Sequence, residues 1–209
     1  MAKEILKLFR VFGLILMTYS INAQGLDHGL WDSLLQRHVS ENGRVDYLGF
    51  KTDSVELSQY LNALEAHLKQ VNSWSKSKKL AFWINAYNAF TVNLICSNWP
   101  LESIKNLYRP WQQVIIKSNY SNLTLDYIEH EILRQLDEPR IHFAINCASR
   151  SCPNLSRRAY VADKLDAQLK QATIDFLSDT SKNNYTKRRI YLSRIFLWFK
   201  NDSLMISYK

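Results

Sequence analysis

Side chains that can carry acid–base or nucleophilic chemistry are concentrated in two short stretches, LDYIEHEIL and RIHFAINCASRSC. The first contains Glu129 and His130, and the second contains His142, Cys147 and Cys152. Carboxyl and imidazole groups can act as general acids or bases, and a thiolate is a strong nucleophile. These five residues are therefore the candidate catalytic residues. The chemistry they suggest is thiol- or carboxylate-assisted hydrolysis or group transfer.

Glu129 is unusual because its neighbours predict an apolar helix face. Thr124 is a suitable N-cap, and helical spacing over residues 125–136 puts leucines and isoleucines on the inward face, with Glu129 at its centre. A carboxylate on such a face needs a partner or has a raised pKa. Glu129 is thus either a structural partner of an arginine or amide, or a general acid or base. His130 is expected on the polar side of the helix, partly exposed.

Cys147 and Cys152 are five positions apart, and three interpretations of this pair stay open. They could form a disulfide worth about 2 kcal/mol in the loop-entropy account, Cys147 could be a nucleophile at the end of a strand, or both could be buried thiols. A thiol nucleophile needs a base within reach. Strand alternation would put His142 on the other face and roughly 16 Å from Cys147. A working pair would therefore need a bulge, a fold-back of Cys152 toward His142, or His130 as the base.

Zinc binding is a further alternative, because Cys147, Cys152, His142 and Glu129 are all acceptable ligands. Their spacing matches no standard zinc motif. The chain also contains no Gly-rich phosphate loop, GxSxG elbow or HExxH motif. We therefore predict neither a metal site nor a cofactor.

The element expected to organise the chain is a helix over residues 79–96, KLAFWINAYNAFTVNLIC. It is apolar on nearly every side, which is typical of a helix buried in the middle of a domain. Asn85 and Asn88 lie on its small-residue face, one turn apart. A buried amide without a partner costs about 1–3 kcal/mol. The two amides therefore either bond to neighbouring main chain or line a binding site.

Periodicity and turn residues predict a single α+β domain over residues 24–209. The central helix 79–96 is expected to pack on a small sheet that includes strand 140–147, with further helices around them. Residues 140–147 are rich in β-branched and aromatic residues and are bounded by polar loops. The other predicted elements are helices at 30–39, 53–71 and 163–179, a hairpin of strands 114–117 and 122–124, a strand at 188–192, and an apolar segment at 195–199.

The first 23 residues have the layout of a secretory signal peptide, with a basic start and a short apolar run over residues 11–21. The run is too short to span a membrane. We therefore predict export to the periplasm or the extracellular space, without stable membrane insertion after cleavage. Cleavage removes three basic residues and one acidic residue, so the formal net charge falls from +8 to +6. The remaining basic excess is densest at 182–194, where a solvated face is the expected explanation, and export argues against a nucleic-acid partner.

Three segments, FWINAYNA, LTLDYIEHEILR and HFAINCASRSCPNL, resemble in this order the family named domain of unknown function 547. GRVDYLGFK and YLSRIFLWFKND resemble its flanking segments, so the likeness runs from about Gly29 to Asp202. The family occurs in exported bacterial proteins, and many members are expected to continue with a helix after Asp202. The resemblance implies no activity. It does imply that nine residues occupy the motif positions of the family, namely Asn85, Asn88, Glu129, His130, His142, Cys147, Ser151, Cys152 and Pro153.

These observations predict a polar pocket where the small face of helix 79–96 meets strand 141–147. Asn85, Asn88 and Ser151 are the candidate binding residues, and the two cysteines are expected at the mouth of the pocket. The partner would be a small molecule or a peptide. The alternative is a non-catalytic binding or structural module that is held together by a disulfide.

Overall fold

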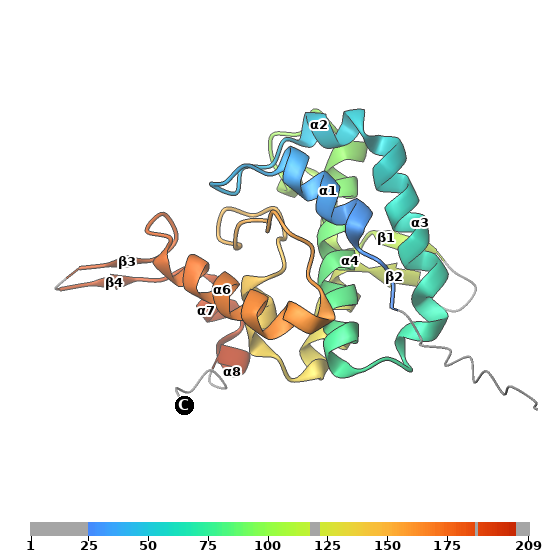
Figure 1. Cartoon of the computed structure of the whole chain (residues 1–209). Helices are drawn as coiled ribbons and strands as arrows, with labels where there is room; N and C mark the ends of the chain where they lie inside the picture. Colours follow the sequence, from blue (N-terminus) through green and yellow to red (C-terminus); the bar gives the residue numbers. More distant parts are fainter. Residues whose placement is uncertain (1–24, 118–121, 187, 204–209) are drawn as a thin grey trace, which may run out of the picture.

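The computed structural model describes residues 25–117, 122–186 and 188–203, and the predicted signal peptide and the turn of the predicted hairpin lie outside these ranges. Helices dominate the chain (Figure 1). The α-helices are α1 (Gly29–His38), α2 (Tyr47–Thr52), α3 (Ser54–Val71), α4 (Lys76–Ser97), α5 (Leu125–Tyr127), α6 (Leu165–Ser178), α7 (Ile195–Trp198) and α8 (Lys200–Ser203). Shorter helical turns are η2 (Ile104–Asn106), η3 (Pro110–Gln112), η4 (Ile128–Leu133), η5 (Arg134–Leu136), η6 (Pro139–Phe143) and η7 (Ala162–Lys164).

Helix α4 lies at the centre of the domain, as the all-round apolar pattern predicts (Figure 1). Ser75 caps it by accepting a hydrogen bond from the main-chain nitrogen of Lys78, and 16 of its 22 residues are buried. Helices α2 and α3 and the turn η4 all pack against it. Burial of this kind, rather than helix propensity, stabilises the element.

Two small antiparallel sheets accompany the helices, which confirms the α+β class. Strands β1 (Val114–Lys117) and β2 (Asn122–Thr124) form the predicted hairpin, with Ile116 opposite Leu123. Strands β3 (Asn184–Tyr185) and β4 (Ile190–Tyr191) form a second pair that projects away from the body of the domain (Figure 1).

The predicted strand 140–147 is wrong. Residues 139–143 form the 3₁₀ turn η6, and residues 144–147 have no regular structure. Pro139 suits the first position of a helical turn, and the Glu138 side chain accepts a hydrogen bond from the main-chain nitrogen of Arg140. Residues 141–145 are all buried, so buried and exposed side chains do not alternate here as they would in a strand with one exposed face.

The predicted helix 125–136 exists, but its middle is not an α-helix. Thr124 caps the first turn as expected, and residues 128–133 then form a π-helix. A π-helix has more residues per turn, so the side chains are spaced differently from the α-helical expectation. Such turns occur frequently at functional sites.

A second, smaller core joins the C-terminal segments to the domain. Phe143, Phe176 and Ile195 are buried together, and Phe196 and Phe199 pack against them. This cluster fixes α7 and α8 beside η6 and α6. The predicted helix 163–179 is confirmed as α6, and the apolar segment 195–199 docks through α7.

Candidate acid–base site

A cavity of about 330 Å³ lies between α4, η4, α7 and the segment that follows η6. Its polar lining side chains are Tyr87, Lys105, Asp126, Glu129, His130, His142 and Ser149. Its apolar walls are Trp111, Ile145, Ile195, Trp198 and Phe199, together with the sulfur-bearing pair Cys147 and Cys152. All five candidate catalytic residues therefore line one cavity. A larger cavity of about 410 Å³ beside α6 contains none of them.

Glu129 enters this cavity from the π-helix with only 12% of its side chain exposed. The Tyr87 hydroxyl of α4 donates a hydrogen bond to its Oε2 atom at 3.1 Å. Burial raises the pKa of Glu129 because it removes water from the carboxylate, while the nearby His130 and the bond from Tyr87 oppose this shift. Glu129 is thus a carboxyl group that can hold a proton at higher pH than an exposed glutamate.

His142 faces Glu129 across the cavity floor, and its side chain is 3% exposed. The imidazole stacks on the Phe199 ring with centroids 3.8 Å apart. Its Nδ1 atom is buried without a hydrogen-bond partner among the residues that the structure describes, 4.0 Å from the Glu129 Oε1 atom. That separation is too long for a direct hydrogen bond. Burial lowers the pKa of His142, and this effect outweighs the nearby Asp202 carboxylate, which raises it.

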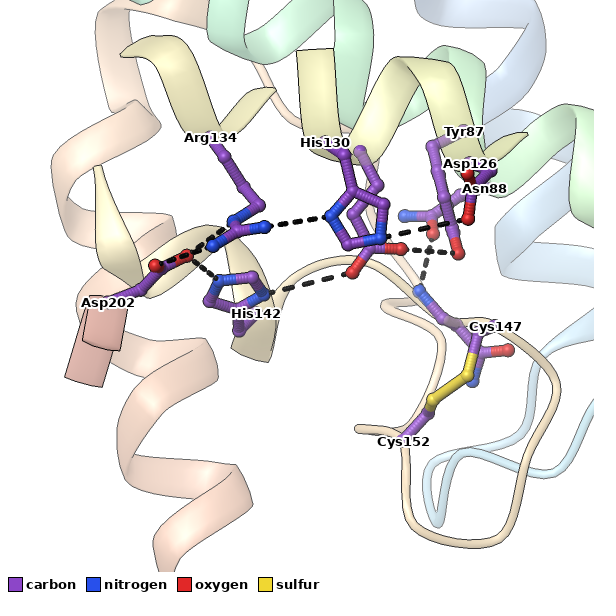
Figure 2. Close-up of polar contacts among 11 residues, drawn as sticks. Tyr87, Asn88, Asp126, His130, Arg134, His142, Cys147, Cys152 and Asp202 are labelled. Atoms are coloured by element: carbon purple, nitrogen blue, oxygen red, sulfur yellow. Dashed lines mark hydrogen bonds and ion pairs between the residues drawn. A yellow bond between two sulfur atoms is a disulfide. The ribbon is translucent and has the colours of Figure 1, made fainter. Parts of the chain in front are cut away.

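Asp202 of α8 orients the imidazole from the other side (Figure 2). Its Oδ2 atom lies 2.9 Å from His142 Nε2, and Arg134 donates to both of its oxygens at 2.7 and 2.9 Å. The hydrogen bond from Arg134 is the main reason that the pKa of Asp202 falls to about 2. Because Asp202 is ionised and can only accept, His142 Nε2 carries the proton. In the neutral ring, Nδ1 is therefore an acceptor that points toward Glu129.

His130 is a second imidazole at the rim of the cavity, between Arg134 and Asp126 (Figure 2). Arg134 lies 2.9 Å from His130 Nδ1, and Asp126 Oδ1 lies 3.7 Å from Nε2. Since arginine only donates, Nδ1 accepts and Nε2 carries the proton. The side chain is 36% exposed, so the expectation of a partly exposed histidine is confirmed, although the ring also lines the cavity.

Cys147 and Cys152 are joined by a disulfide, with their Cα atoms 6.1 Å apart (Figure 2). Of the three interpretations, the disulfide is therefore the one the structure contains. Neither sulfur is a thiolate nucleophile or a zinc ligand in this state. The described residues contain no group of three or more histidine, cysteine, aspartate or glutamate side chains placed to hold a metal ion. Burial raises the pKa of the remaining cysteine, Cys96, to about 11, which also argues against a thiolate there.

The candidate binding residues Asn85, Asn88 and Ser151 do not line the cavity. Asn85 exchanges hydrogen bonds with the main chain of Tyr160 at 2.8 and 3.0 Å. Asn88 bonds to the Ala144 carbonyl and the Asn146 nitrogen, and so holds the main chain that follows η6. Of the two alternatives given for these amides, the structure contains the hydrogen bonds to main chain. The two asparagines were identified as polar side chains on an apolar helix face. That pattern does not distinguish an amide that binds a ligand from one that binds main chain.

The Ser151 carbonyl accepts a hydrogen bond from the Ser193 hydroxyl at 2.8 Å, so its observed contact is also structural. The serine of this loop that reaches the cavity is Ser149.

Sequence reasoning missed four residues that complete the site, namely Tyr87, Trp111, Arg134 and Asp202. Tyr87 and Trp111 look like ordinary core aromatics in the sequence. Asp202 ends the YLSRIFLWFKND segment, so its place in a family-like segment was a usable signal. Its 60-residue separation from His142 hid the contact.

The fold and this site define a class: an α+β domain with a buried helix, and an apolar cavity that contains a carboxyl–imidazole pair supported by an aspartate and an arginine. The chain belongs to the family "Protein of unknown function, DUF547", whose model matches residues 71–177. The matched range includes α4, the π-helix, His142 and the disulfide loop. Comparison with curated proteins and with solved structures finds no match. No helix in the described part of the chain is both long and apolar enough to cross a membrane.

Proposed function

We propose that this protein is a hydrolase in which Glu129 and His142 act together as general acid and base on the ester bond of a small, largely apolar molecule. The observation that carries the proposal is the unpartnered Nδ1 atom of His142, which is buried, directed into a cavity and 4.0 Å from the Glu129 carboxyl. A buried polar atom without a partner is rare and costly. A substrate or water atom between the two groups would contact both.

The direction of the two pKa shifts supports a shared proton. The pKa of Glu129 is raised from its ordinary value of 4.5 and the pKa of His142 is lowered from 6.5, so the two values approach each other. In this proposal the two groups, 4.0 Å apart, titrate as a pair. Between its two titrations the pair holds one proton, and it can accept a proton at one position while donating one at the other.

In the proposed step, a water molecule bound beside His142 gives a proton to Nδ1 and its oxygen attacks the acyl carbon of the ester. The Glu129 hydroxyl gives its proton to the leaving alkoxide, so ester and water become acid and alcohol. The ionised Asp202 stabilises the imidazolium, and Tyr87 stabilises the Glu129 carboxylate. The proton then returns from His142 to Glu129.

The apolar walls favour a substrate with an apolar group. Trp111, Ile145 and Trp198 surround the acid–base pair. The Nε1 atom of Trp111 is buried without a partner among the described residues and can only donate. In this proposal it binds the carbonyl oxygen on which negative charge develops.

We also propose that the protein works outside the cytoplasm. The disulfide supports this location, because disulfides persist in oxidising compartments. The signal-peptide pattern of the first 23 residues points the same way.

The test is hydrolysis of p-nitrophenyl acetate and p-nitrophenyl benzoate by the wild type and by Glu129→Gln. General acid–base catalysis contributes about 10²–10⁴-fold, so we expect kcat/KM to fall at least 100-fold. Glu65→Gln is the matched control, because burial also raises the pKa of Glu65, which lies on α3 and not at this cavity. Equal rates for the wild type and Glu129→Gln, or no hydrolysis by the wild type, would overturn the proposal.

The second candidate is a non-catalytic binding module. Its support is that Asn88 and the disulfide both hold the main chain on either side of Ile145 and Cys147, which line the cavity. Saturable quenching of tryptophan fluorescence by p-nitrophenol, without hydrolysis of either ester, would favour this candidate.

A further inference from the structure

The C-terminal arm carries most of the basic excess of the chain. We define the arm as residues 182–186 and 188–200, which include β3, β4 and α7. Between Asp179 and Asp202 the sequence contains six lysines and arginines and no acidic residue. The whole chain has a formal net charge of +8. The density of positive charge is therefore higher in the arm than in the rest of the chain.

The cations of the arm are available for an outside partner. Arg188, Arg189, Arg194 and Lys200 are all exposed. None of them takes part in the ion pairs found among the described residues, whereas the nearby Lys182 is paired with Asp179. A set of unneutralised charges this dense repels itself and attracts anions.

The same arm exposes large hydrophobic side chains. Ile190 is 67% exposed, Leu197 is 70% exposed and Trp198 is 49% exposed, and Tyr191 and Leu192 are exposed as well. These five are among the twelve large hydrophobic residues that are exposed in the described part of the chain. All five lie within nine consecutive residues of the arm, and exposed hydrophobic side chains gathered in this way are typical of an interaction site.

Buried polar groups hold the base of the arm in place, while β3 and β4 project from the body (Figure 1). Asn183 donates to the Phe176 carbonyl of α6 and accepts from the Ser193 nitrogen, and both side chains are buried. The Ser193 hydroxyl also bonds to the Ser151 carbonyl in the disulfide loop. The exposed groups are thus presented on a fixed support.

We propose that this arm binds the surface of a bilayer that contains anionic phospholipids. Such a surface offers phosphates to the arginines and an apolar layer just beneath them, and tryptophan and tyrosine favour that boundary. A soluble polyanion would satisfy the charges but leave the hydrophobic side chains in water. Trp198 also lines the 330 Å³ cavity, so lipid bound at the arm lies next to the candidate acid–base site.

The test is co-sedimentation of the whole protein with vesicles of phosphatidylcholine alone and of phosphatidylcholine with phosphatidylglycerol. We expect binding to the second kind only, weakened by added salt. Each basic residue near an anionic surface contributes about 1 kcal/mol, so R188Q/R189Q should lower the binding constant about 30-fold. K164Q/K170Q, which removes two exposed lysines of η7 and α6, is the matched control and should bind like the wild type.

A second double variant, I190S/L192S, tests the apolar contribution and should also lower vesicle binding. The proposal is overturned if the wild type does not sediment with anionic vesicles, or if the control loses as much binding as R188Q/R189Q. It is also overturned if I190S/L192S leaves vesicle binding unchanged while the wild type binds soluble polyphosphate equally well, because the partner would then be a polyanion without an apolar part.

Discussion

In two clusters of the residues that the structure describes, a histidine and an arginine both contact the same oxygen of one aspartate. In the first, His38 Nε2 lies 2.7 Å from Asp53 Oδ2, and Arg37 lies 3.2 Å from the same oxygen. In the second, His142 Nε2 lies 2.9 Å from Asp202 Oδ2, and Arg134 lies 2.7 Å from that oxygen. Each imidazole also packs on a phenylalanine ring. By composition and by these contacts the two clusters are nearly the same.

The two clusters differ in the surroundings of the other imidazole nitrogen, Nδ1. His38 Nδ1 is packed so closely against Gly49 of α2 that even a Cβ atom at that position would collide with it. His142 Nδ1 has no hydrogen-bond partner among the described residues and lies 4.0 Å from Glu129, and both residues line the cavity. A histidine held by an aspartate is therefore not enough to define a site. The second nitrogen must also lack a hydrogen-bond partner and face another titratable group.

Replacing the two histidines is the strongest test of this difference. His142→Asn should lower kcat/KM for p-nitrophenyl acetate by about 10²–10⁴-fold, because it removes the proposed base. His38→Asn, which changes the same residue type in the other cluster, should leave kcat/KM within about twofold of the wild type, since its effect would be on folding alone. Thermal unfolding of both variants verifies that they are folded. Similar losses in the two variants would mean that the clusters do not differ in function.

The two aspartates should show the same contrast with a smaller effect. Asp202→Asn leaves the base in place but loosens its orientation, and misplacement by about 1 Å can cost on the order of 100-fold. We expect kcat to fall about 10- to 100-fold in Asp202→Asn and to stay unchanged in Asp53→Asn. The measurement is the pair of steady-state rates at neutral pH. Unchanged kcat in Asp202→Asn would remove the positioning role that the geometry assigns to this residue.

The sequence predicted the central architecture because its strongest signals were local. The apolar run of 79–96, the cap at Thr124 and the hairpin strands all depend on residues within one element. Residues 140–147 misled the prediction because the run is buried on every side, a pattern that a strand and a short 3₁₀ turn share.

The candidate site was predictable in part for the same reason. Glu129 was identified because one carboxylate stood within an apolar pattern, and the structure brings it to His142 as expected. Asp202 could not be placed because its position depends on α7 docking through Phe143 and Phe176, a contact between distant segments. Asp53 also depends on a contact between two elements. It is the N-cap residue of α3, yet its side chain makes no cap bond and binds His38 instead.

Removing the disulfide separates sulfur chemistry from the histidine chemistry of the second cluster. C147S/C152S should lose about 2 kcal/mol of unfolding free energy, because a short loop is no longer closed in the unfolded chain. Ester hydrolysis should persist in the folded variant, since neither sulfur has a role in the proposed step. Denaturant unfolding gives the stability, and steady-state rates give the activity. A folded C147S/C152S variant without activity would contradict the proposed step and would indicate that the cysteines, rather than His142, are needed for the reaction.

The smallest expected effect is the change in the stability of the second cluster at low pH. The folded-state pKa of Asp202 is about 2, below its ordinary value of 3.8, so its ion pair stabilises the folded protein above pH 3.8 and loses this contribution as the pH falls toward 2. Because the group is only partly buried, solvent screening reduces the contribution to about 1 kcal/mol. The difference in unfolding free energy between the wild type and Asp202→Asn should therefore be constant near neutral pH and shrink below pH 3.8. A difference that stayed the same from neutral pH down to pH 2 would show that Arg134 does not stabilise the ionised carboxylate, and the support of His142 would need another explanation.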